Sequence, residues 1–175
     1  MSIRHPWDTD GSAFSVGKTA EEDFANAFHK RFGIYPVRTF EMRDKYDHID
    51  YEARVAGKVV TFDVKAPKKI NRHDEQCSGE FVWVEFVSKG FLGWLYGKAD
   101  FVAFQQPDKS FICVKRTALL EYCEEHCSTH FVTSTANAEF NLYVRCSPNE
   151  SQDIMTLIRT EYLKLLPKTW FLSLT

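Results

Sequence analysis

The sequence predicts one domain of the α/β or α+β class, in which a β-sheet is flanked by helices. Short apolar segments with strand character follow one another through the middle of the chain, separated by turn residues. Helical patterns lie before and after them. No internal repeat or low-complexity linker divides the 175 residues, and a chain of this length can bury a substantial core. We therefore expect residues 1–175 to form a single domain.

Composition indicates an ordinary globular protein. The chain is 44% hydrophobic and 26% charged, with a net charge of -2, so contact with nucleic acid would need a local basic patch. The five cysteines are odd in number, which fits reduced thiols better than a disulfide framework. No apolar run is long enough to span a bilayer, and the polar N-terminus with Pro6 and Gly11 does not resemble a signal peptide. We expect a cytoplasmic protein without a membrane partner.

The first helix is expected between Ser15 and Gly33. Thr19 and Glu22 have the spacing of a capping box, and Gly33 fits a C-terminal stop. The apolar stripe of this helix consists of Phe24, Ala25, Phe28 and Phe32.

The remaining segments predict further strands, loops and helices. Strands are expected at residues 36–42, 48–55, 58–65, 81–87, 101–105, 111–115 and 138–146, and helices at 117–127 and 151–166, the last ended by Pro167. Residues 66–80 read as a polar loop, and residues 90–100 as an aromatic segment interrupted by glycines.

Two aspartates and a lysine are predicted to meet on one hairpin. A two-residue turn at Ala56–Gly57 would place Asp50 opposite Asp63, and strand alternation puts Lys65 on the same face. Two like charges about 5 Å apart repel each other, whereas a divalent cation between them would be coordinated. A shift of the register by one residue would destroy this arrangement.

Glu21 is a third candidate acid. The apolar residues of the first helix follow it at i+3, i+4, i+7 and i+11, so Glu21 lies on the stripe that faces the core. An unpaired carboxylate is costly there, and Glu22 already fills the capping role. Glu21 would fit at the edge of a metal site.

These residues resemble the PD-(D/E)XK nuclease superfamily, and within it the small phage-type and Holliday-junction-resolvase-like nucleases. The resemblance rests on Glu21 in "GKTAE", on Asp50, and on Asp63-Val64-Lys65. It extends through "DVKAPKK", "FVWVEF" and "GWLYGKADFVAF", so it covers about residues 17–104. Two departures are that no proline precedes Asp50, and that Asp47 offers a competing acid.

The resemblance implies a restriction-endonuclease-like fold, with a mixed central sheet flanked by helices and an αβββαβ-type core at about residues 17–130. It also implies a Mg²⁺-dependent endonuclease that hydrolyses DNA phosphodiester bonds, is phage-encoded and prefers branched or damaged DNA, with Mn²⁺ as a substitute metal. RNA as the substrate stays open, and so does the oligomeric state, with a homodimer as one option.

The resemblance implies a role for each matching residue. Asp50 and Asp63 would ligate the metal, with the Val64 carbonyl as a further ligand. Glu21 would hold the metal or a metal-bound water. Lys65 would orient or activate the attacking water and stabilise charge on the phosphate.

Basic residues follow this motif in the predicted loop. Lys68, Lys69 and Arg72 would contact phosphates beside the cut site, which would make binding sensitive to salt. The alternative is a solvated loop whose charge is balanced by Asp74 and Glu75.

Several residues admit two interpretations. Glu85, in an apolar run, would join the metal site or pair with Lys89 or Lys98. Trp83, Trp94 and Tyr96 would stack on bases or, more in keeping with their glycine-flanked context, pack in the core. Cys123, Cys127 and His130 share one helical face and could bind zinc, whereas buried cysteines of a core stripe explain them more simply.

Two other functions compete with the nuclease. One is a nucleic-acid-binding module that keeps the fold and cleaves poorly. The other is a globular protein without nuclease activity that carries a zinc clip at Cys123–His130.

Overall fold

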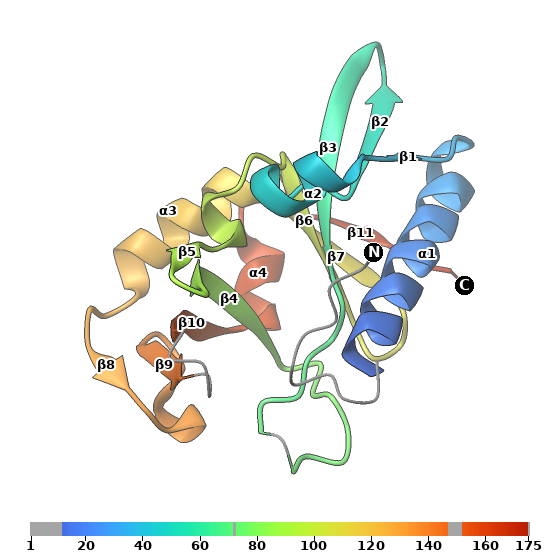
Figure 1. Ribbon diagram of the computed structural model, residues 1–175. Helices are drawn as coiled ribbons and strands as arrows, with labels where there is room; N and C mark the ends of the chain where they lie inside the picture. Colours follow the sequence, from blue (N-terminus) through green and yellow to red (C-terminus); the bar gives the residue numbers. More distant parts are fainter. Residues whose placement is uncertain (1–11, 72, 147–151, 175) are drawn as a thin grey trace.

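The computed structural model describes residues 12–71, 73–146 and 152–174. They form a mixed α/β protein with two mixed β-sheets and four α-helices (Figure 1). The first sheet contains, in spatial order, β1 (Val37–Arg38), β2 (Tyr51–Val55), β3 (Lys58–Lys65), β6 (Phe101–Gln105), β7 (Phe111–Lys115) and β11 (Trp170–Leu172). The second contains β5 (Phe91–Leu92), β4 (Phe81–Ser88), β10 (Gln152–Arg159), β9 (Leu142–Cys146) and β8 (Phe131–Val132).

The helices are α1 (Ser12–Phe32), α2 (Glu41–Asp47), α3 (Arg116–His126) and α4 (Thr160–Leu165), with single-turn 3₁₀ helices η1 (Trp94–Tyr96) and η2 (Thr135–Asn137). Strands β3 and β6 pair in parallel, as do β8 and β9, whereas the other ladders between the named strands are antiparallel. The chain between β3 and β6 passes through a loop, β4, β5 and η1. It therefore leaves the first sheet and builds part of the second before returning.

The prediction of a mixed α/β protein is confirmed, but the chain forms two sheets where one central sheet was expected. The second sheet was missed because β10 was read as part of a helix spanning residues 151–166. In the structure β10 lies between β4 and β9, and its residues from Met155 to Ile158 are buried. This run is apolar except for Thr156 and is buried on both faces, so it has no period that separates strand from helix.

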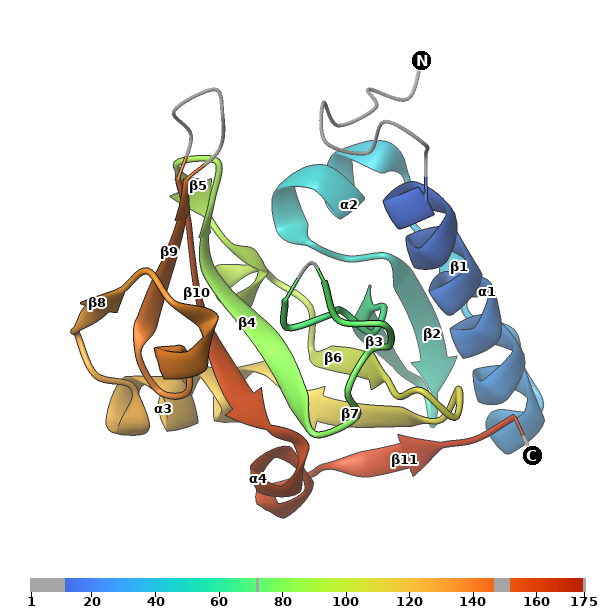
Figure 2. The same ribbon diagram turned by 90° about the horizontal axis from the view of Figure 1, so that it is seen from below.

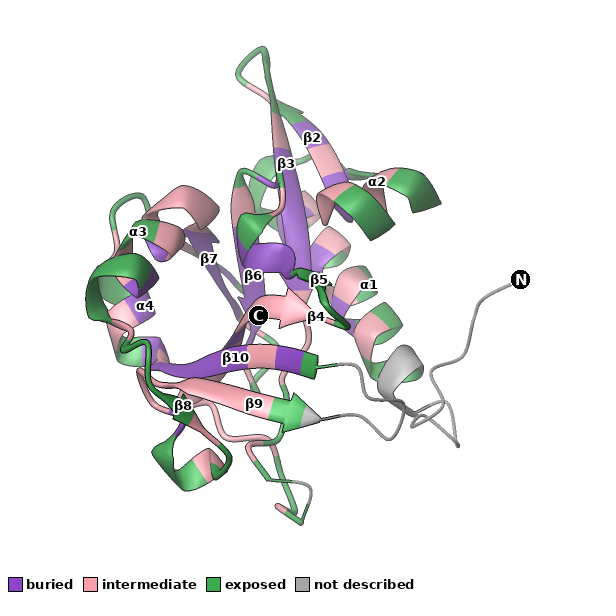
Figure 3. Cartoon of the chain, turned by 60° about the vertical axis from the view of Figure 1, so that its left-hand side comes forward, coloured by how far each residue is buried: buried purple, intermediate pink, exposed green. Residues whose placement is uncertain are grey.

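Two hydrophobic clusters lie on opposite faces of the first sheet. On one face, Phe24 and Phe28 of α1 pack against Phe62 of β3, with ring centroids 5.2 and 5.3 Å apart. On the other face, Val102 and Phe104 of β6 join residues of β4, η1, α3, β10 and α4. The first sheet is thus enclosed on both sides, and its central strands β3, β6 and β7 carry long buried stretches (Figures 2 and 3).

The first helix starts earlier than predicted. Thr19 lies inside α1, and its hydroxyl donates to the Ser15 carbonyl at 3.0 Å, so the predicted capping box with Glu22 is wrong. The predicted stop at Gly33 is confirmed by φ +71° and by a hydrogen bond from its N–H to the His29 carbonyl. The strand predicted at residues 36–42 shrinks to the two residues of β1, because Glu41 begins α2.

The hairpin of β2 and β3 has the predicted register. Val55 pairs with Lys58, and the ladder continues to Tyr51 and Phe62. At Asp50 the ladder becomes irregular. The register would pair Asp50 with Asp63, but the Asp50 N–H donates to the carbonyl of Phe62, the residue before Asp63, at 2.8 Å. The hairpin therefore delivers Asp50 to the neighbourhood of Asp63, although not as a regular ladder pair.

The tight turn of this hairpin is strained at its first residue. Ala56 has φ 49° and Gly57 has φ 79°, which is the pattern of a two-residue turn with both central residues left-handed. We expect Ala56→Asn to raise the free energy of unfolding by about 0.5–1 kcal/mol, because asparagine tolerates this conformation better than alanine. Urea denaturation at neutral pH measures the change.

Gly57→Ala is the matched control. No atom lies within 4 Å of a Cβ added at Gly57, so any destabilisation comes from the backbone conformation alone. We expect a loss of about 1 kcal/mol. Equal stability of both variants and the wild type would contradict the turn geometry.

Candidate functional site

Strand β3 brings Asp63 and Lys65 to one point. Phe62 and Val64 face α1 and join its hydrophobic cluster, so the alternate residues Asp63 and Lys65 point to the opposite face. Asp63 is only 2% exposed, and its Oδ1 lies 2.6 Å from Lys65 Nζ. The structure thus shows a buried acid paired with a lysine two residues further along the same strand.

Asp50 completes the central group. Its Oδ2 accepts a hydrogen bond from the Val64 N–H at 2.6 Å, so a side chain takes over as acceptor where the ladder ends. Burial and then the charge of Asp63 raise the pKa of Asp50 to about 6. Burial also raises the pKa of Asp63, although Lys65 opposes this.

Glu21 approaches this group from α1, as the sequence predicted. Its Oε2 lies 2.6 Å from Nη2 of Arg38 on β1, and its side chain is 16% exposed. Burial first, and then the negative charge of Asp50, raise the pKa of Glu21 to about 7, with Arg38 acting in the opposite direction. The acidic group therefore gathers Glu21 from α1, Asp63 from β3 and Asp50 from the position just before β2.

Asp44 belongs to the same group and was missed by the sequence analysis. Burial raises its pKa, as do the charge of Asp50 and a side-chain hydrogen bond with Asp50. The competing acid Asp47 instead pairs with Lys98, with Oδ1 and Nζ 2.8 Å apart. The signal that could have found Asp44 is the helix at Glu41–Asp47, where the sequence analysis expected a strand only as far as residue 42 and assigned no element to residues 43–47.

His48 also borders the group. It ends α2 in a left-handed conformation, with φ 53°, and is half-buried. Burial first, and then the positive charge of Lys65, lower its pKa. The left-handed conformation of His48 thus turns the chain at the end of α2, and Asp50 follows two residues later.

The donor atoms of this group suit a hard divalent cation. Asp63 Oδ2 is buried and has no hydrogen-bond partner, and the surrounding acceptors are carboxylate oxygens, which Mg²⁺ prefers. Among the residues that the structure describes, no three histidine, cysteine, aspartate or glutamate side chains already stand in a metal-holding arrangement. Lys65 occupies Asp63 and Arg38 occupies Glu21, so binding of a cation would require these ion pairs to open.

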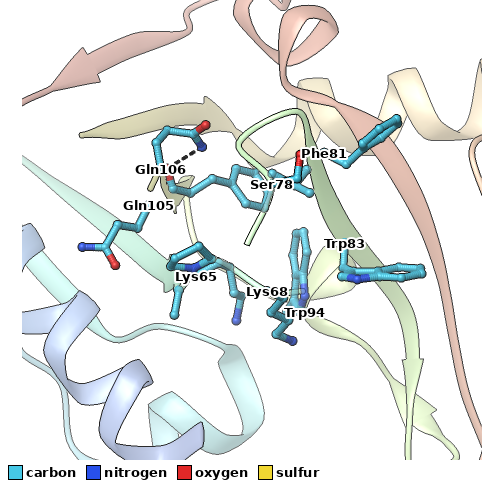
Figure 4. Close-up of a pocket in the computed structure, with 12 residues that line it drawn as sticks. Lys65, Lys68, Ser78, Phe81, Trp83, Trp94, Gln105 and Gln106 are labelled. Atoms are coloured by element: carbon cyan, nitrogen blue, oxygen red, sulfur yellow. Dashed lines mark hydrogen bonds between the residues drawn. The ribbon is translucent and has the colours of Figure 1, made fainter. Parts of the chain in front are cut away.

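A small pocket lies next to Lys65. It has about 20 Å³ of space open to water, enough for about one water molecule, and its lining includes Lys65, Lys68, Trp83 and Trp94 (Figure 4). Trp94 is buried, as its core interpretation predicted, and its ring centroid lies 5.3 Å from Lys65 Nζ. This contact holds the lysine on the face of the first sheet that is opposite to α1.

The predicted phosphate-contacting lysines lie on the loop that follows β3. Lys68 and Lys69 are exposed, and Lys68 extends beside Lys65 (Figure 4). Arg72 lies outside the described residues. Although the Lys68 side chain as a whole is exposed, protein atoms around its ammonium group displace water and lower its pKa, with Glu85 opposing and Lys65 reinforcing the shift.

Glu85 acts on the site through its charge, whereas the predicted zinc ligands form no metal-holding group among the described residues. Glu85 is half-buried on β4 and acts on Lys65 and Lys68 through its charge, whereas the proposed partner Lys98 is engaged by Asp47. Cys123 is buried in the cluster behind the first sheet. Within the described part of the chain, Cys123, Cys127 and His130 do not assemble as a metal-holding group.

Comparisons with family models, with curated protein sequences and with solved structures found no match. No helix in the described residues is both long and apolar enough to cross a membrane.

The raised pKa values predict how stability depends on pH without metal. Glu21 and Asp50 hold their protons more tightly in the folded state, so their contribution is present below about pH 4 and is lost as the pH rises through about 6 to 7. We expect Glu21→Gln to match the wild type at about pH 4 and to exceed its unfolding free energy by on the order of 2 kcal/mol at pH 8. Denaturation in EDTA at several pH values measures this difference.

Glu22→Gln provides the control for this experiment. Glu22 is the adjacent acid of α1 and is exposed. Its variant should follow the wild-type curve throughout the pH range. A Glu21→Gln curve that stays parallel to the wild type would contradict the assigned burial of the Glu21 charge.

Proposed function

We propose that the protein is a Mg²⁺-dependent endonuclease that hydrolyses DNA phosphodiester bonds, on a fold of the restriction-endonuclease-like type. The observation that carries this proposal is the buried Asp63 beside Lys65 on β3, with Asp50 bonded to the Val64 N–H between them. A structural ion pair does not require a second buried acid next to it, because two acids raise the cost of burial. A site that binds a divalent cation gains from the second acid, because Mg²⁺ is commonly held by one or two carboxylates.

The order of elements supports the same proposal. Helix α1 covers the β2–β3 hairpin and contributes Glu21, and β6 pairs with β3 in parallel. The chain between β3 and β6 departs from the αβββαβ-type core, since it contributes β4 and β5 to a second sheet. This departure leaves the hairpin and its acids in place.

Each residue has a role in this proposal. Asp50 and Asp63 would hold Mg²⁺ with the Val64 carbonyl, and Glu21 would hold the ion or its water. When bound, Mg²⁺ would polarise the phosphate and lower the pKa of a water molecule. Lys65, freed from Asp63, would orient the attacking water and stabilise the negative charge that develops on the phosphate.

The first test is cleavage. Plasmid, linear, single-stranded, flapped and four-way-junction DNA are incubated with the protein in Mg²⁺, Mn²⁺ or EDTA. We expect metal-dependent cutting that falls by about a hundredfold or more in Asp63→Asn and in Lys65→Ala, because each removes a group acting on the reacting phosphate. The preferred substrate also shows whether branched DNA is favoured.

Two controls accompany the cleavage test. Lys58→Ala removes an exposed lysine at the other end of β3, and Asp47→Asn removes the competing acid that pairs with Lys98. Both should cut like the wild type. Cutting that persists in EDTA, or in Asp63→Asn, would refute the proposal.

A measurement of metal binding distinguishes the role of the carboxylate ligands from the role of Lys65. We expect Lys65→Ala to bind Mn²⁺ more tightly than the wild type, by about three- to tenfold, because removing the ammonium frees Asp63 and removes a repelling charge. Affinity should also rise from pH 6 to pH 8 as Asp50 and Glu21 lose their protons. Titration calorimetry measures both effects.

Asp63→Asn is the comparison for this titration. It should abolish Mn²⁺ binding, and Lys58→Ala should leave it unchanged. Weaker binding in Lys65→Ala than in the wild type would contradict the view that the ammonium and the metal compete for Asp63.

A further inference from the structure

The face of the second sheet opposite to the side chain of Val84 carries an aromatic pair. Trp83 on β4 and Tyr143 on β9 meet across β10, with ring centroids 5.4 Å apart and ring planes inclined by 37°. Val84, the neighbour of Trp83 along β4, points into the cluster behind the first sheet, so Trp83 points the other way. Both rings are half-buried and belong to neither hydrophobic cluster.

The loop after β3 is tied to this aromatic pair. The Trp83 indole Nε1–H donates to the Lys69 carbonyl at 3.1 Å, which fixes the ring and the loop together. Lys68 precedes this anchor and lines the same pocket as Lys65 and Trp83 (Figure 4). The aromatic pair, the loop and the candidate site are therefore continuous.

Charged side chains of both signs lie near the pair on the side of the loop. Lys68 makes no ion pair with any of the described residues. The charges of Lys65 and Arg145 act against its protonated form, whereas those of Glu85 and Asp153 favour it. Arg145 pairs with Asp153 at 2.6 Å, yet its side chain stays 51% exposed. An anion beside Lys68 would relieve this repulsion, and a phosphate is an anion of the proposed substrate.

Proteins that bind single-stranded nucleic acid commonly combine exposed aromatic rings with nearby positively charged side chains. Bases stack on the rings whatever their sequence, and cations hold the backbone. A base inside a duplex is already stacked on its neighbours and offers no free face. The combination therefore fits an unpaired strand better than a continuous duplex.

We propose that Trp83 and Tyr143 stack an unpaired base while Lys68 holds an adjacent phosphate, so that the second sheet binds an unpaired stretch of DNA next to Asp63 and Lys65. This inference deepens the proposed function, on which it rests for its ligand. The simpler alternative is that the two rings only shield β10 from water.

The test is equilibrium binding of a labelled twelve-nucleotide oligothymidylate in EDTA, followed by fluorescence anisotropy. We expect Trp83→Ala and Tyr143→Ala each to weaken binding on the order of tenfold. Lys68→Gln should weaken it and lower the salt dependence by about one counterion. The matched controls are Phe131→Ala, an exposed aromatic residue on β8 of the same sheet, and Lys58→Gln, and both should bind like the wild type.

A second comparison changes the DNA and not the protein, so its result does not depend on whether a variant folds correctly. The wild type should bind oligothymidylate on the order of tenfold more tightly than an abasic strand of equal length, and Trp83→Ala should bind both alike. Wild-type protein that binds both strands equally would overturn the inference. So would tighter binding of a blunt duplex, or of oligouridylate, than of oligothymidylate.

Failure of this inference can be told from failure of the proposed function. Cleavage that needs Asp63, together with Trp83→Ala that binds oligothymidylate normally, would refute the stacking face and leave the nuclease intact. Base-dependent binding that is lost in Trp83→Ala, with no cleavage in any metal, would refute the nuclease and leave the stacking face intact.

Discussion

The buried contact between Asp63 and Lys65 constrains the rest of the site. An aspartate that is 2% exposed in the middle of a sheet is costly unless a cation accompanies it, and the lysine two residues further along β3 is the group that can reach it. Asp50 then finds its own partner in the Val64 N–H of the same strand. The site is thus organised around one strand, and the other elements bring further acids to it.

The acids of the site repel one another when they are ionised, and this repulsion lowers the stability of the folded protein. The pKa values of Glu21, Asp44, Asp50 and Asp63 are all raised, in each case first by burial. Hydrophobic packing compensates, because α1 seals one face of the first sheet with phenylalanine rings and a second cluster fills the other face. A strongly packed scaffold can hold acids that would otherwise move apart or stay protonated.

The second sheet gives the site a neighbouring surface. Because the chain leaves β3 for β4 before it returns as β6, the loop with Lys68 and Lys69 is held between the acidic hairpin and Trp83. A direct helical crossover would have left this loop without such an anchor. The same departure that distinguishes this chain from the expected αβββαβ-type core therefore creates the surface on which our binding proposal rests.

The sequence by itself determined the local features with a clear period or a specific turn. It predicted the bounds of β3, β6 and β7, the Ala56–Gly57 turn and the hairpin register. Alternation of apolar residues fixes which face of a strand is buried, and a two-residue turn fixes which residues pair across the hairpin. It also placed Glu21, Asp50, Asp63 and Lys65 in one neighbourhood. Only the tertiary structure decided that residues 152–159 form a central strand, since their local pattern fits a helix or a strand and pairing with both β4 and β9 selects the strand. Only the tertiary structure brought Asp44 to Asp50 and Trp83 to Tyr143, because these contacts join elements whose pairing no local pattern specifies.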